Sequence, residues 1–116
     1  MYSIYKYILK EPVTIITAPI VKWLNVDYQE IEHSFVVWAI IDLDKKKKRR
    51  FGIVWFETGE KILQIGDTVF NGLEYLGTAK CEWYVAHFFV KELNPKNTDY
   101  ISEIEKEELV LDNAGA

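Results

Sequence analysis

Apolar and polar residues alternate in short runs from Tyr2 to Val90, and turn-forming residues separate the runs. Period-two alternation rich in aromatic and β-branched residues is typical of strands. The pattern predicts antiparallel strands joined by short turns, at Tyr2–Leu9, Val13–Ala18, Val21–Tyr28, Phe35–Leu43, Arg49–Glu57, Leu73–Lys80 and Glu82–Val90.

The Phe35–Leu43 run is nearly all apolar, which predicts a central strand covered on both faces. Covering both faces of a small sheet requires closure into a barrel, a packed helix or a partner subunit. The predicted fold class is therefore mainly β: an antiparallel sheet of about six or seven strands that could roll toward a barrel, plus one C-terminal helix.

Strict alternation within Val21–Tyr28 places Trp23 and Asn25 on one face and Lys22 and Val26 on the other.

The C-terminal part of the chain changes character. Thr58–Gly72 is rich in turn residues, and Pro95 ends the last strand region. Residues 97–111 predict a helix of about 12 residues, capped by Asn97 or Thr98, which either docks or partly frays. We therefore divide the chain into a β domain, 1–93, and an acidic helix and tail, 94–116.

Charge narrows the range of partners. The 116 residues carry a net charge of −4, which argues against a DNA or RNA partner. The charge is segregated, because Lys45–Arg50 are six consecutive cations and residues 99–112 are strongly acidic. These are either two solvated surfaces or two poles that attract each other within a subunit or across an oligomer.

Cysteine and histidine usage excludes several site types. Cys81 is the only cysteine, so no internal disulfide forms and an intracellular location is favoured. No apolar run approaches the roughly 20 residues of a membrane helix. Two His and one Cys cannot complete a four-ligand zinc site. We expect no metal, no cofactor and no membrane partner.

Catalysis lacks a motif. Cys81 and His87 are the most tempting pair, but six residues of extended strand separate them by roughly 20 Å. An activated nucleophile needs a base within about 3 Å. We predict no catalytic residue and favour a protein that is not an enzyme.

Phosphate binding remains open. No Gly-rich phosphate-binding motif of the common kinds is present. The "ETGEK" turn contains Thr58, Gly59 and Lys61, whose backbone N–H groups and ammonium could hold an anion; the alternative is an ordinary turn.

The "RRFGIVWF" segment offers a second anion site. Alternation separates Arg50 from Arg49, which shares its face with Trp55. An arginine held by a strand can grip phosphate with two N–H groups, and nearby rings such as Trp38 could stack on a base. The alternative is a surface cation–π contact, and Lys45–Lys48 would then only solvate a turn.

The last two predicted strands supply further candidates. Trp83 is a third ring for stacking, and His87 and Tyr75 could line a pocket. The alternative for His87 is a hydrogen-bonded histidine within the core.

Six short words of the sequence occur in a characteristic order: "IYKY", "VWAIID", "RRF", "TG", "YLGT" and "VAHFF". Their order and spacing, from about Ser3 to Glu92, resemble a family of short bacteriophage proteins of unknown function. Ala86 departs from the tryptophan that the family pattern has before the histidine. The resemblance implies a phage accessory protein in the host bacterial cytoplasm.

Small phage proteins of similar size include oligomeric sponges that sequester nucleotide signals of bacterial defence. By this analogy of context we expect a non-enzymatic homo-oligomer that binds a cyclic nucleotide or ADP-ribose-type ligand. The alternatives are a protein–protein interaction module, such as an inhibitor or assembly factor, and a small nucleotide hydrolase.

Overall fold

The fold is known from a computed structural model, which describes residues 1–45, 47–61 and 72–93. These residues form seven strands and no helix. In chain order the strands are β1 (Tyr2–Leu9), β2 (Val13–Ala18), β3 (Ile20–Gln29), β4 (Ser34–Asp42), β5 (Arg49–Glu57), β6 (Glu74–Lys80) and β7 (Val85–Glu92). The mainly β prediction is confirmed, and the predicted helix lies outside the described residues.

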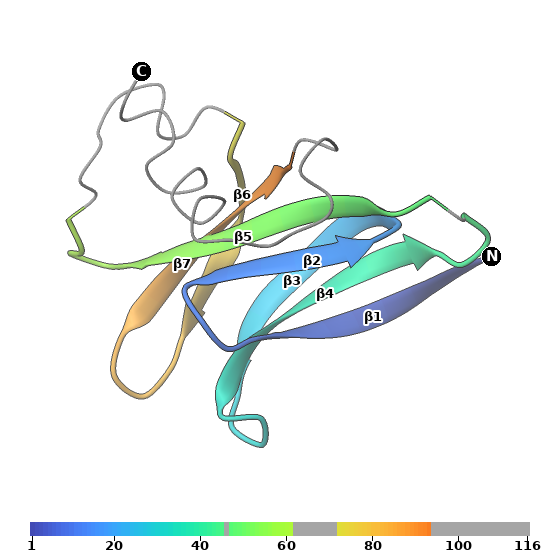
Figure 1. The fold of residues 1–116 in the computed structure, drawn as a ribbon. Coiled ribbons are helices and arrows are strands. Elements are labelled where there is room, and N and C mark those ends of the chain that lie inside the picture. The colour runs from blue at the N-terminus through green and yellow to red at the C-terminus, as the bar shows by residue number, and fades with distance from the viewer. Residues whose placement is uncertain (46, 62–71, 94–116) are drawn as a thin grey trace.

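The strands belong to two antiparallel sheets rather than to one. A three-stranded sheet has the order β1-β4-β3, and a four-stranded sheet has the order β2-β5-β7-β6. Figure 1 shows β2 and β5 passing over the three-stranded sheet. The prediction of a single sheet was wrong, and the described strands do not close into a barrel. Alternation identified the strands but not which ones pair, because pairing depends on contacts remote in sequence.

The core lies between the two sheets. Phe35 of β4 meets Trp55 of β5 and Phe88 of β7, with ring centroids 5.1 Å apart in both pairs. Tilted and edge-on ring pairs of this kind add to the stability that burial provides. The core-facing side of β5, with Phe51, Ile53 and Trp55, agrees with the alternation predicted from sequence.

Two bulges alter the predicted faces of β3. The pairing of β3 with β4 shifts between Ile20 and Lys22 and again between Trp23 and Asn25. Each shift inserts one residue and reverses the later alternation. Trp23 and Val26 consequently share the core side, whereas Lys22 and Asn25 are exposed on the other. The strict alternation predicted for this strand was therefore wrong.

The central position of β4 is confirmed, because it lies between β1 and β3. Only one of its faces packs on the second sheet. Phe35, Val37, Ala39 and Ile41 are buried in the core, whereas Trp38 on the opposite face is partly exposed.

Candidate functional site

Arg49 begins β5 on the side of the strand that faces the core. Its Nη2 donates a hydrogen bond to the backbone carbonyl of Ile20 at 2.9 Å, and its guanidinium carbon lies 5.2 Å from the centre of the Phe51 ring. Nη1 lies 3.4 Å from Oε1 of Glu92, and both side chains are about half exposed. These contacts from three strands hold the guanidinium at one end of the sandwich.

A hollow of about 310 Å³ opens beside Arg49, between the ends of β3, β5, β6 and β7. Trp23 and Phe51 form its aromatic wall, in an edge-on pair with centroids 5.4 Å apart and an interplanar angle of 86°. Glu74 and Glu92 also line it. The hollow thus combines a ring surface, a cation and two carboxylates.

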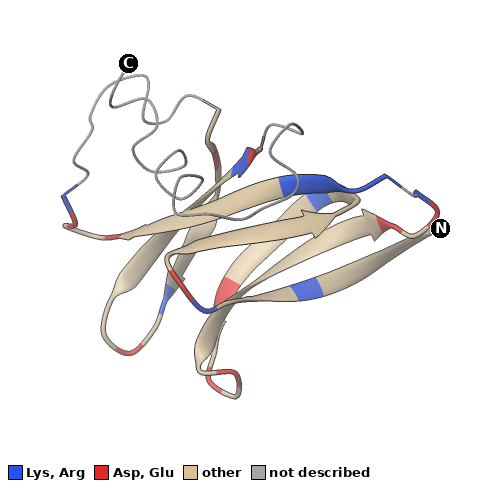
Figure 2. Ribbon diagram, in the orientation of Figure 1, with Lys and Arg blue, Asp and Glu red and all other residues tan. Residues whose placement is uncertain are grey.

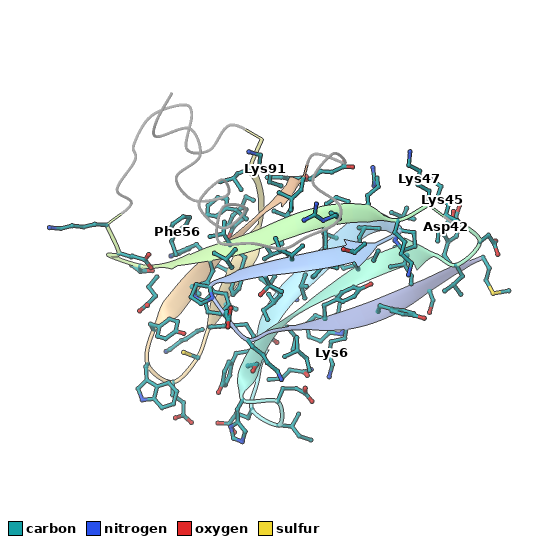
Figure 3. All side chains as sticks on the ribbon, in the orientation of Figure 1. Lys6, Asp42, Lys45, Lys47, Phe56 and Lys91 are labelled. Atoms are coloured by element: carbon teal, nitrogen blue, oxygen red, sulfur yellow. The ribbon has the colours of Figure 1, made fainter. Side chains whose placement is uncertain are left out.

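A second hollow of about 440 Å³ lies at the tip between β4 and β5, lined by Pro19, Ile20, Lys45, Lys47 and Arg49. Figure 2 shows this tip as a run of positive residues, and Figure 3 shows the Lys45 and Lys47 side chains extending from it. Ile20 and Arg49 border both hollows. We call the two together the Arg49 cleft.

The Arg49 cleft has the chemistry of a site for an anion that carries a flat ring. Ligand sites in proteins commonly measure about 300–1,000 Å³ and place a few polar groups around an apolar surface. Trp23 and Phe51 offer that surface, and arginine and lysine offer charge to phosphate. Carboxylates such as Glu74 could accept hydrogen bonds from amino or hydroxyl groups of the same ligand.

A chain of hydrogen bonds crosses the opposite face of the four-stranded sheet. Nε2 of His87 lies 2.6 Å from Oγ1 of Thr58, and Nδ1 lies 3.1 Å from Oγ1 of Thr78. Oγ1 of Thr78 is in turn 2.5 Å from the hydroxyl of Tyr75. The structure therefore brings three residues predicted from sequence, Thr58, Tyr75 and His87, into one polar network with Thr78, which sequence reasoning had not selected.

Near the other end of β5, a smaller hollow of about 120 Å³ is lined mainly by aromatic residues, among them Trp55, Trp83 and Tyr84. Burial, followed by the nearby Cys81 and Glu57, raises the pKa of the Tyr84 hydroxyl above its usual value. Trp55 lies six residues from Arg49 along β5, a separation of roughly 20 Å, and Trp83 lines the small hollow together with Trp55. These two rings therefore belong to a different place from the Arg49 cleft.

The remaining residues predicted from sequence are dispersed. Arg50 is 5% exposed and points to the face of β5 opposite Arg49. Trp38 lies on the outer face of the three-stranded sheet. Gly59, at a φ of 88°, occupies the turn after β5, and Lys61 is exposed just beyond it. None of these four lines the Arg49 cleft.

Sequence reasoning missed most of the cleft. It did not select Trp23, Phe51 or Glu92, it considered Glu74 only as a hint of a hydrolase, and it assigned Lys45 and Lys47 to a solvated turn. Trp23 was visible as a tryptophan in a predicted strand, but its neighbour Lys22 lies on the opposite face of β3 and does not line the cleft. The two glutamates could not be placed beside Arg49 from the sequence, because they reach it only through the order in which β5, β7 and β6 pair.

Residues 1–45, 47–61 and 72–93 contain neither a group of metal-binding side chains nor a membrane-spanning helix. In this part of the chain, no three His, Cys, Asp or Glu side chains gather so that they could hold a metal ion. The same residues contain no helix long and apolar enough to cross a membrane.

The fold and the cleft define an antiparallel two-sheet β domain with an aromatic-walled hollow at one end, next to a lysine-lined one. The chain belongs to the family described as "Domain of unknown function (DUF7352)", whose model matches residues 1–98. Neither the curated proteins nor the solved structures contain a match to the chain. The family match covers all seven strands and brings no activity with it.

Proposed function

We propose that this domain binds a small nucleotide-derived anion in the Arg49 cleft and sequesters it without turning it over. The observation that carries the proposal is the position of Arg49 at the junction of two hollows, with Trp23 and Phe51 on one side and Lys45 and Lys47 on the other. A base would stack in the aromatic hollow while its phosphate meets the cations.

The lining of the cleft favours binding over catalysis. Its described residues include no Ser, Thr, Cys or His, and the groups that could act as general bases are Glu74 and Glu92. Oε1 of Glu92 lies 3.4 Å from Nη1 of Arg49, and this ion pair stabilises the ionised carboxylate. Arg49 is also held in place before any ligand arrives, by the Ile20 carbonyl and the Phe51 ring. A fixed cation reduces the ordering cost of binding.

In its biological setting, the protein would be a phage accessory protein that acts in the host bacterial cytoplasm. Its ligand would be an immune signal of the cyclic-nucleotide or ADP-ribose type, and its removal would silence the defence that depends on it. The likeness of the sequence words to short phage proteins supports this setting. A pure binder needs stoichiometric amounts of protein, which a chain of 116 residues can supply at low synthetic cost.

The first experiment captures the ligand from cells. Purified protein is incubated with lysate from bacteria whose nucleotide-based defence is active, washed by filtration and denatured, and the released molecules are identified by mass spectrometry. An intact nucleotide at close to one per site supports the proposal. A protein that releases no small molecule, and binds neither cyclic AMP, a cyclic dinucleotide nor ADP-ribose by calorimetry, contradicts it.

A matched pair of variants then tests the location. Lys47→Ala removes a cation at the cleft, whereas Lys80→Ala removes an equally exposed lysine from the far end of β6. We expect Lys47→Ala to weaken binding several-fold and Lys80→Ala to leave it unchanged. Equal effects would mean that overall charge, and not the cleft, attracts the ligand.

A nucleotide hydrolase is the second candidate, favoured by one observation. The hydroxyl of Thr58 lies 2.6 Å from Nε2 of His87, within the range at which a base can take its proton. Release of a breakdown product in the capture experiment, abolished by His87→Gln, would favour this candidate. An intact ligand whose affinity is unchanged in His87→Gln would favour the binding protein.

A further inference from the structure

Exposed apolar side chains lie among polar ones on the outer face of the three-stranded sheet. Ile4, which belongs to this face, is 61% exposed, and Tyr2 near its edge is 66% exposed. Trp38 and Ile40 of β4 lie between the two edge strands and are partly exposed. Large apolar patches on a soluble protein, framed by polar residues, commonly mark interaction surfaces.

The strand register arranges this face as a grid of three rows across β1, β4 and β3. The rows contain Ile8, Val36 and Asp27, then Lys6, Trp38 and Asn25, and then Ile4, Ile40 and Lys22. Trp38 occupies the centre. Asp27 and Lys22 are both on β3, one row above and one row below the central row.

We propose that this face is the contact surface of a symmetric dimer, and that its occupant is a second copy of the same chain. A two-fold axis that runs along the central row, over Trp38, exchanges the outer two rows. Asp27 of each copy then faces Lys22 of the other, so that the charges on the face are self-complementary. A two-fold interface must be self-complementary in this way, because the same patch of surface contacts itself on the other subunit.

The apolar residues obey the same symmetry. Ile8 of one copy faces Ile4 of the other. Val36 is fully buried in its own subunit, so Ile40 of the other copy meets the side chains that surround it. Trp38 meets its own counterpart at the centre. The strands of the two copies run antiparallel to each other, which agrees with the near-aligned packing of sheet on sheet.

Among the charged residues of the grid, only Lys6 faces the same residue of the other copy across the axis. Residues of its own subunit hold its ammonium group away from that contact. Its Nζ donates a hydrogen bond to Oε1 of Gln29 at 2.9 Å and lies 3.9 Å from Oε1 of Glu32. Figure 3 shows Lys6 on β1, the edge strand of the sheet. With these partners, the ammonium does not leave an uncompensated charge at the interface.

The size of the face sets the expected strength. Three strands at about 4.8 Å spacing and about eight residues at 3.3 Å give a footprint of roughly 350–400 Å² per copy. Stable complexes commonly bury about 800 Å² per partner, so we expect a dimer with a dissociation constant in the micromolar range. This inference does not depend on any ligand of the Arg49 cleft, which lies between the two sheets at one end.

Sedimentation velocity of the full chain between about 1 and 500 μM tests the dimer. We expect the mass to rise with concentration from the 13.6 kDa monomer toward twice that value. Ile4→Glu should weaken dimerisation at least tenfold while circular dichroism shows an unchanged fold. Ile31→Glu is the matched control, because Ile31 is 85% exposed in the β3–β4 turn, outside the grid.

Charge reversal tests the axis itself. Asp27→Lys and Lys22→Asp should each weaken the dimer at least tenfold. In the homodimer of either variant, positions 27 and 22 form two pairs of like charge across the axis. An equimolar mixture of the two variants should dimerise again, since one copy then carries two lysines and the other two aspartates. A wild-type chain that stays monomeric at 500 μM overturns the proposal. So does a dimer that ignores Ile4→Glu, or two reversed variants that fail to recover when mixed.

Discussion

The guanidinium carbon of Arg49 lies 5.2 Å from the centre of the Phe51 ring, two residues along the same strand. Residues two apart on a strand share a face, so the contact follows directly from the local sequence. The Ile20 carbonyl accepts a hydrogen bond from the same guanidinium, which joins the two sheets at this end.

Arg49→Lys tests how far binding depends on that geometry. Lysine keeps the charge but loses the planar group that bridges the Ile20 carbonyl and the Phe51 ring. We expect the affinity for the captured nucleotide to fall on the order of tenfold, equivalent to about 1.4 kcal/mol. Calorimetry measures the affinity. Unchanged binding would show that charge alone suffices and that the fixed position of Arg49 is irrelevant.

Gly77 allows β6 to approach β3. A Cβ built at this position would lie 2.9 Å from Cγ2 of Val26, closer than real Cβ contacts come. We expect Gly77→Ala to lower the free energy of unfolding by about 1–3 kcal/mol through overpacking. Urea denaturation measures the loss.

A double mutant checks the cause of that loss. Val26→Ala removes the opposing methyl group, so Gly77→Ala should cost less in the Val26→Ala background than in the wild type. A coupling of roughly 0.5–3 kcal/mol is usual for residues in direct contact. Strict additivity of the two costs would assign the effect of Gly77→Ala to its backbone conformation instead.

Phe88 tests the inter-sheet core. It is fully buried and contacts the rings of Phe35 and Trp55 at 5.1 and 5.3 Å. Phe88→Ala should cost about 3–5 kcal/mol, a large share of the roughly 5–15 kcal/mol by which an ordinary domain is stable. Trp83→Ala removes an even larger ring, but Trp83 is 78% exposed, so a cost of about 0.5 kcal/mol or less is expected. Thermal denaturation of both variants provides the comparison.

Tyrosine ionisation makes stability depend on alkaline pH. Burial is the main cause that raises the pKa values of Tyr7 and Tyr84 in the folded protein. The folded state holds these protons more tightly than the unfolded chain, whose tyrosines titrate near about 10. The contribution of these two tyrosines to the free energy of unfolding is therefore fully present below about pH 10. It is lost as the pH rises through their pKa values in the folded protein.

Absorbance at alkaline pH follows the phenolates directly. We expect a later fraction of the absorbance change, which includes Tyr7 and Tyr84, to appear together with unfolding. Tyr84→Phe should reduce that later fraction. A single transition in which all tyrosines ionise alike, without unfolding, would contradict the prediction.

Alternation predicted the strands well, because side chains of a strand must divide between a core face and an outer face. The inward set of β5, from Phe51 to Trp55, is where the pattern placed it. The bulges of β3 escaped prediction, since each depends on how the strand pairs with β4 and not on its own residues.

The candidate site was harder to predict for the same reason. Arg49 was selected from its place in a strand beside aromatic residues, a local signal. Glu92 lies 43 residues away and reaches Arg49 only because β7 pairs with β5. Trp38 was grouped with Arg49 because its strand comes just before that of Arg49 in the sequence, but β4 belongs to the other sheet. Trp83 lies between β6 and β7 and lines the small hollow near the other end of β5.

The order of the strands bears on how the chain folds as it is synthesised. β1 pairs with β4 and β2 pairs with β5, so neither of the first two strands has its partner when it leaves the ribosome. The three-stranded sheet is complete once Asp42 has emerged, but its core face stays uncovered until β5 and then β7 follow. Such non-local pairing folds slowly, on a scale of milliseconds to seconds. During that interval β1 and β3 flank β4, but the apolar core face of the sheet is not yet covered by the second sheet. Nascent chains on neighbouring ribosomes could therefore contact each other through this face before either domain is complete.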